Sequence, residues 1–190
     1  MHLFKGSLMD QKIKKLTITD KLVEIGPEIT SGQTGSYAYL EFERQGRILN
    51  VASEDHTRSR LAGMLGIENS QFYLLLTTNT HTKQATAVMA AFGEQFGPKY
   101  ALNMEGHGAE SAIAASKRIV RHSYIIQLLG LFFFIVGIPA LLLFVGIPMI
   151  IGGIYTIFQA MKMRKAALLS IAVIREMMNI QRSIPDIKYL

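Results

Sequence analysis

The chain has 190 residues, with 20 Lys and Arg against 14 Asp and Glu, a net charge of +6, and no cysteine. Its length fits one or two small domains, and the lack of cysteine excludes disulfides, thiolate metal sites and a cysteine nucleophile. The mean hydropathy of +0.25 excludes a disordered chain and indicates that the apolar residues are segregated.

Residues 1–122 are predicted to form a small cytoplasmic domain of the α+β or α/β class. Apolar and polar residues alternate over 37–43, and a short apolar run follows at 48–51, which together predict a β-hairpin. The run at 71–78 predicts a buried strand, and the shorter run at 99–104 predicts another. These strands would form the sheet of the domain.

Three helices are predicted in the same domain. The first covers residues 56–65 and stops near Gly66, and the second opens at Thr80 or Thr82 and ends near residue 97. The third begins near Ala109 and meets no Pro or Gly until Gly130. It is therefore expected to continue into the apolar segment that follows.

Residues 123–161 contain no Asp, Glu, Lys, Arg or His. A spanning helix needs roughly 20 apolar residues, so this stretch predicts a transmembrane α-helical hairpin with spans near 123–138 and 149–161. The alternative to the hairpin is a single kinked span. In the hairpin, two copies of Val-Gly-Ile-Pro mark the turn between the spans, because proline ends or kinks a helix. The predicted turn residues are Gly137, Pro139, Gly146 and Pro148.

Basic residues flank this segment on both sides and mark the cytoplasmic side of a membrane. Because both clusters are basic, we expect an integral, multi-pass membrane protein with both termini in the cytoplasm, as in a bacterial inner membrane. No signal peptide is predicted, since charges begin at Lys5. The residues expected to set the topology are Lys117, Arg118, Arg121, Lys162, Arg164 and Lys165.

Residues 162–190 are predicted to form a basic and apolar cytoplasmic C-terminal helix that ends before Pro185. This helix is apolar around most of its circumference, so it needs a surface to cover. That surface is either its own domain or another subunit. Small residues at four-residue spacing, Gly152, Thr156 and Ala160, predict close helix packing, either within the hairpin or between subunits.

Candidate catalytic residues are few. Glu54, Asp55 and His56 place two carboxylates beside an imidazole, but neighbours in sequence seldom face one another, and we expect an exposed helix start. His107 lies between two glycines in a predicted turn, and residues 31–36 resemble a phosphate loop without its lysine. No catalytic, metal-binding or cofactor-binding residue is assigned, and no cofactor is expected.

The leading interpretation is a non-enzymatic membrane subunit whose cytoplasmic domain and C-terminal helix bind other protein subunits, as a scaffold or accessory component of a transport or secretion complex. The alternatives are a small membrane-bound enzyme or ligand sensor and an immunity-type or regulatory membrane protein. The expected partners are the lipid bilayer and other protein subunits, in a hetero- or homo-oligomer. Nucleic acid is not expected, because the basic residues gather at the membrane edges, where anionic headgroups account for them.

Overall fold

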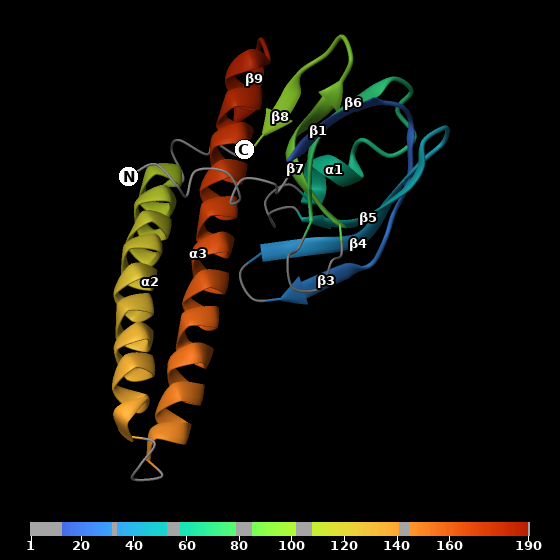
Figure 1. The fold of residues 1–190 in the computed structure, drawn as a ribbon. Helices are drawn as coiled ribbons and strands as arrows, with labels where there is room; N and C mark the ends of the chain where they lie inside the picture. Colours follow the sequence, from blue (N-terminus) through green and yellow to red (C-terminus); the bar gives the residue numbers. More distant parts are fainter. Residues whose placement is uncertain are drawn as a thin grey trace. The chain divides into compact units, whose positions relative to one another are not determined.

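The computed structural model describes residues 13–31, 34–52, 58–78, 85–101, 108–140 and 145–189. Within these ranges there are nine strands and three helices (Figure 1). The chain divides into two compact units, one of residues 1–108 with 173–190 and the other of residues 109–172. The segment 109–172 is therefore inserted in sequence between two parts of the first unit.

The first unit contains a mixed nine-stranded sheet. Its longest path runs β1-β6-β7-β5-β4-β2, with β3 paired to β4 and with β8 joining β7 to β9. The pairs are antiparallel except β5–β7 and β8–β9, which are parallel. The strands are β1 Lys14–Thr19, β2 Leu22–Ile25, β3 Glu28–Ser31, β4 Thr34–Phe42, β5 Gly46–Ala52, β6 Ser70–Thr78, β7 Ala85–Glu94, β8 Lys99–Ala101 and β9 Ile187–Tyr189.

The two ends of this path are joined by the chain itself, because only Asp20 and Lys21 separate β1 from β2. The sheet therefore curves round a closed interior. Helix α1, Arg58–Ala62, contributes the fully buried Leu61 to that interior. Other large side chains that fill the interior include Leu22, Leu40, Phe42, Val51, Phe72, Leu74 and Phe92.

The end of helix α3 covers the opposite face of the sheet. Helix α3, Gly146–Ser183, places Met177 and Ile180 in a second core with side chains of β6, β7 and β8, and Ile184, directly after the helix, joins them. The Nε2 of Gln181 donates to the carbonyl oxygen of Ala90 (3.2 Å), so the buried amide of this glutamine is bonded. The tail therefore finds its apolar surface within its own unit.

The predicted helix from Thr80 or Thr82 to residue 97 is wrong, because Ala85–Glu94 is the central strand β7. Phe92 and Met89 of β7 face the interior core, whereas Ala90 and Ala91 face the core under α3. A strand buried on both faces shows no alternation, and a short apolar run cannot be told from a buried helix by its period.

Other predicted elements of this unit are confirmed. The hairpin is β4 paired with β5, and the strands at 71–78 and 99–104 are β6 and the shorter β8. The helix predicted over 56–65 is confirmed only in part, because α1 ends at Ala62 and not near Gly66, and residues 56 and 57 lie outside the described residues. Residues 31–36, compared above with a phosphate loop, contain the ends of the paired strands β3 and β4.

The predicted transmembrane α-helical hairpin is wrong. Among the described residues one helix, α2 (Ala109–Gly137), is long and apolar enough to cross a membrane. The uncharged start of α3, residues 146–161, would measure about 24 Å at 1.5 Å per residue, less than the ~30 Å of a hydrocarbon core. Beyond it α3 continues as a charged helix into the sheet unit, so the predicted C-terminal helix is the end of α3 and not a separate element.

The core under α3 makes a testable contribution to stability. Ile180→Ala removes a buried side chain, and we expect it to lower the free energy of unfolding by about 2–4 kcal/mol. Urea denaturation of the full chain in detergent, followed by circular dichroism, measures the change. The neighbouring exposed Asn179 is the control, because Asn179→Ala should change stability by less than about 0.5 kcal/mol. Equal effects would contradict the packing of this segment on the sheet.

Candidate functional site

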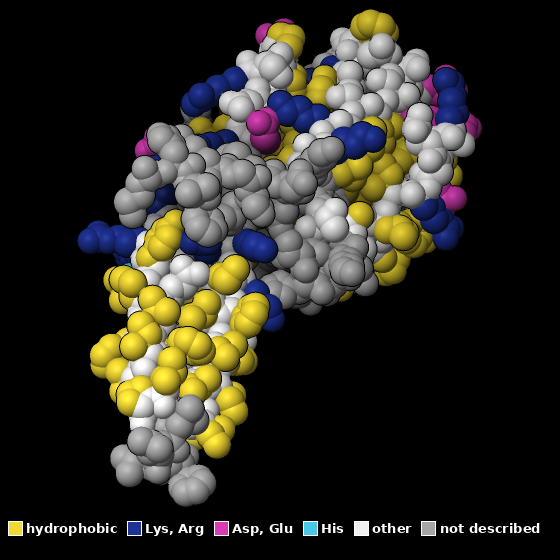
Figure 2. Space-filling model, viewed as in Figure 1, with side chains coloured by type: hydrophobic (Ala, Val, Ile, Leu, Met, Phe, Trp, Pro, Cys, Tyr) yellow, Lys and Arg dark blue, Asp and Glu magenta, His cyan; other side chains and the backbone are white. Residues whose placement is uncertain are grey.

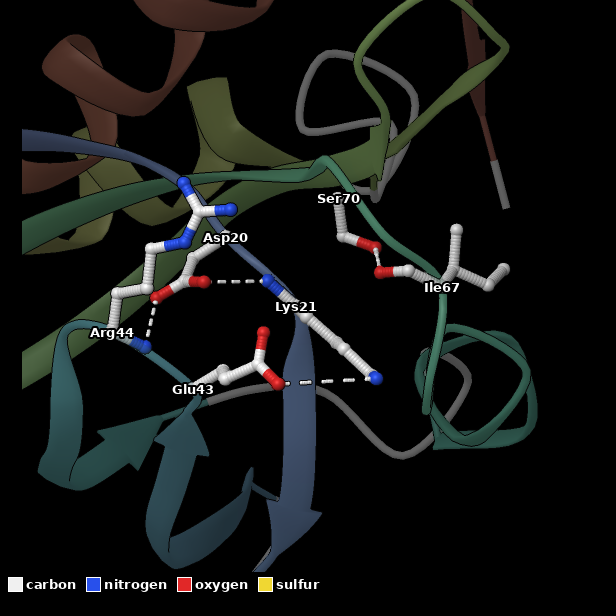
Figure 3. Close-up of polar contacts among 6 residues, drawn as sticks. All are labelled: Asp20, Lys21, Glu43, Arg44, Ile67 and Ser70. Atoms are coloured by element: carbon white, nitrogen blue, oxygen red, sulfur yellow. Dashed lines mark hydrogen bonds and ion pairs between the residues drawn. The ribbon is translucent and has the colours of Figure 1, made fainter.

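A buried polar group of the sheet unit is the carboxylate of Asp20, at the corner between β1 and β2 (Figure 3). It accepts hydrogen bonds from the backbone N–H groups of Lys21 (2.8 Å), Arg44 (2.8 Å) and Gln45 (2.9 Å). The N–H of Asp20 donates to the carbonyl oxygen of Ser70 (2.9 Å). Asp20 therefore links the end of β1 and the start of β6 to the turn between β4 and β5.

Burial raises the pKa of the Asp20 carboxyl, but the backbone N–H groups of Gln45, Arg44 and Lys21 lower it more, and the net pKa lies below 3.8. The carboxylate is the form that accepts these three bonds. It is buried, with 3% of its surface exposed, and the hydrogen bonds that it accepts from described residues come from backbone N–H groups. This arrangement closes the sheet and offers no proton for acid–base chemistry.

We expect Asp20→Asn to lower the free energy of unfolding by about 1–3 kcal/mol near neutral pH, because backbone donors lose their charged acceptor. Since the folded-state pKa is depressed, the contribution is complete above the ordinary pKa of 3.8 and is lost as the pH falls through the folded-state pKa. The difference in the free energy of unfolding between the variant and the natural chain should therefore become smaller at acidic pH.

Denaturation of both chains at several pH values measures this difference. Glu43→Gln is the matched control, because Glu43 is exposed and lies 4.0 Å from Lys21 (Figure 3), a distance at which an exposed pair contributes little. If Asp20→Asn lowers the free energy of unfolding by the same amount at every pH, the negative charge of Asp20 does not stabilise the closure of the sheet.

A second polar cluster lies on the outer surface of β2, β4 and β5. The hydroxyl of Tyr39 donates to Glu24 (2.7 Å), and the Nε of Arg47 donates to Glu41 (2.8 Å). The Arg47 guanidinium also lies 4.5 Å from the centre of the Tyr39 ring. The hydrogen bond to Glu24 raises the pKa of Tyr39, which keeps this phenol protonated. We therefore assign the cluster to the support of this surface and not to catalysis.

Helix α2 and the first part of α3 run antiparallel (Figure 1), and they approach each other closely at glycines. A Cβ added to Gly153 would lie 2.6 Å from the carbonyl oxygen of Gly130, and one added to Gly130 would lie 2.9 Å from the carbonyl oxygen of Gly153. At Gly137 a Cβ would lie 3.1 Å from the carbonyl oxygen of Gly146. The two backbones are therefore in direct contact, which only small residues permit.

These contacts belong to a repeat of seven residues on each helix, as in a coiled coil. The buried residues of α2 include Ser116, Ser123, Gly130 and Gly137. Those of α3 in the same unit include Gly146, Gly153, Ala160 and Ala167. The contacts of Gly130 with Gly153 and of Gly137 with Gly146 set a register in which Ser123 lies opposite Ala160. We call these eight residues the small-residue seam.

The large apolar side chains of both helices lie outside the seam. Figure 2 shows hydrophobic side chains over much of the visible surface of this helix pair. Leu128 is 67% exposed, and Ile151 is 62% exposed. Others are Ile125, Leu129, Leu131, Phe132, Ile135, Ile147, Ile154 and Phe158. The pattern is the reverse of a coiled coil in water, which buries its large apolar residues.

Each residue predicted for the turn or for helix packing has a definite place. Gly137 ends α2, Gly146 begins α3, Pro148 lies in the first turn of α3, and Pro139 follows α2. Ala160 is buried in the seam, whereas Gly152 and Thr156 line a hollow of about 330 Å³ beside it. The glycine that contacts α2 is Gly153, one residue beyond Gly152.

The candidate catalytic residues Glu54, Asp55, His56 and His107 lie outside the described residues. In the part of the chain that the structure describes, no group of three His, Cys, Asp or Glu side chains is placed to hold a metal ion. The predicted topology residues Lys117, Arg118, Arg121, Lys162, Arg164 and Lys165 lie on α2 and α3, directly beyond the apolar outer surface.

The small-residue seam was missed because the sequence was read for a four-residue spacing on one helix. A seven-residue spacing of Ser, Gly and Ala on both sides of the turn was the signal that could have found it.

Two adjacent glycines of α3 provide a test of the seam. Gly153→Ala places a methyl group against the backbone of α2, and we expect it to separate the helices and lower the melting temperature of the full chain in detergent. Gly152→Ala meets no atom within 4 Å, and it should be neutral or stabilising by up to about 1 kcal/mol, because alanine favours a helix. Identical melting temperatures for the two variants would contradict direct backbone contact.

Comparison with known proteins adds no relative: no family model, curated protein or solved structure matches this chain. The geometry of the helix pair and of the sheet therefore carries the functional argument.

Proposed function

We propose that this chain is a membrane-anchored protein in which α2, the one described helix long and apolar enough to cross a bilayer, is the anchor, and the shorter apolar start of α3 packs against it without crossing. The observation that carries the proposal is the reversed pattern of the pair, with small residues at the helix contact and large apolar residues outside. In water such an exposed apolar surface is unfavourable, and it marks a protein or membrane contact. In lipid the same surface is solvated, and close packing of small residues holds the helices together.

The distribution of charge along the pair supports the same proposal. On α2 the side chains from Tyr124 onward are uncharged, whereas Lys117, Arg118 and Arg121 precede them. On α3 the uncharged residues come first, and Lys162 follows. Because the helices are antiparallel, both basic groups lie at the same end of the pair. That end would face the headgroups and the water beyond them.

The nine-stranded sheet is then the part of the chain that remains in water. The end of α3 covers the outer surface of β6 and β7, whereas Val23 of β2 (52% exposed) and Leu49 of β5 (60% exposed) are uncovered. This surface is where we expect a protein partner to bind. The proposed role is therefore that of an anchored, non-enzymatic subunit of a membrane complex, and the identity of the partner stays a prediction.

Flotation with phosphatidylcholine vesicles tests the anchor. The full chain should float with the vesicles and resist extraction by alkaline carbonate. Leu128→Glu should reduce the floated fraction strongly, because an acidic residue in place of leucine inside a bilayer costs about 3 kcal/mol, or roughly a hundredfold in partition.

Leu49→Glu is the matched control, because Leu49 is exposed to a similar extent on the sheet, and it should float like the natural chain. A natural chain that stays monodisperse in buffer without detergent and does not float would refute the membrane anchor.

A further inference from the structure

Arg164 of α3 lies where the apolar outer surface of the helix pair ends. Its guanidinium lies 5.0 Å from the centre of the ring of Tyr124, the first residue after the seam residue Ser123 on α2. Its Nε is buried, and no described residue accepts a hydrogen bond from it. The aromatic ring therefore holds one face of the guanidinium in place, while its buried Nε has no acceptor among the described residues.

The charge around Arg164 is strongly one-sided. Residues 109–172 contain a single acidic residue, Glu110. The register of the seam places Arg121 opposite Lys162 and Arg118 opposite Lys165. Both helices therefore contribute cations at the same positions along the axis of the pair. None of these residues forms an ion pair with a described carboxylate. We call the residues Lys117, Arg118, Arg121, Lys162, Arg164 and Lys165 the basic collar.

From this geometry we infer that Arg164, held by Tyr124 within the basic collar, binds the phosphate of an anionic phospholipid headgroup. The inference rests on the proposed membrane anchor. An arginine fork matches the geometry of a phosphate and forms two parallel charge-assisted hydrogen bonds with it. In a bilayer the phosphates lie just outside the hydrocarbon core, which is where the apolar surface of the pair gives way to the collar.

Charge complementarity decides the class of lipid. A zwitterionic headgroup brings its own cation close to the collar, whereas an anionic headgroup brings none. Each Lys or Arg near an anionic surface contributes attraction that falls with increasing salt. The collar should therefore select anionic phospholipids from a mixed bilayer, and Arg164 should contribute more than a single exposed charge, because its guanidinium is already oriented.

Native mass spectrometry of the full chain, released from nanodiscs of phosphatidylcholine and phosphatidylglycerol, tests this inference. For the natural chain we expect the retained phosphatidylglycerol to exceed its bulk proportion by about fivefold or more. Arg164→Gln should lose most of this enrichment. Arg175→Gln removes the same charge from an exposed position on α3 outside the collar, and it should keep the enrichment. Arg164→Lys keeps the charge but loses the planar guanidinium, and its enrichment of phosphatidylglycerol should lie between those of the natural chain and Arg164→Gln.

The outcomes separate this inference from the anchor on which it rests. A chain that inserts into pure phosphatidylcholine but shows no enrichment of phosphatidylglycerol overturns the headgroup site and leaves the anchor intact. Equal losses in Arg164→Gln and Arg175→Gln, or full enrichment in Arg164→Lys, overturn the role of the oriented guanidinium. A chain that does not insert into phosphatidylcholine refutes the anchor, and the headgroup site with it.

Discussion

The direct contact between two helix backbones, at Gly130 and Gly153, constrains the rest of the helix pair. A Cβ at either position would overlap the opposite backbone, so the contact has no room for a large side chain. The large apolar residues of both helices must then lie on the outside, where Leu128 and Ile151 are largely exposed. A pair built in this way has no apolar core in water, and its outer surface needs an apolar solvent or partner. The membrane proposal follows from this packing.

The sheet unit depends on a different constraint, which is the closure of the sheet at Asp20. Three backbone N–H groups from two segments converge on one carboxylate, so the corner that joins the two end strands β1 and β2 is fixed to the turn between β4 and β5. Strand β7 lies between the interior core and the core under α3. Residues 173–190 thus complete the unit that residues 1–108 begin. Residues 109–172 leave this unit and return to it, as expected of an insertion that serves a separate purpose.

Sequence reasoning succeeded where one local signal dominated. The alternation at Tyr37–Phe42 and the turn at Gly46 predicted β4 and β5, and the lack of Pro or Gly after Ala109 predicted α2. It failed at Ala85–Glu94, where burial on both faces removed the alternation that identifies a strand. It made no prediction for β9, because a strand of three residues is formed only by its pairing with β8. Of the site, it located the basic residues but not the ring of Tyr124 beside Arg164.

By itself the sequence determined where apolar and charged residues lie along the chain, because composition is a local property. That information was enough to find the uncharged segment 123–161, its basic ends and the stop at Pro185. Only the tertiary structure decided that α3 is one helix whose end packs on the sheet, that β7 is a strand, and that Gly153 rather than Gly152 contacts α2. These outcomes depend on which surfaces meet, and residues far apart in sequence supply those surfaces.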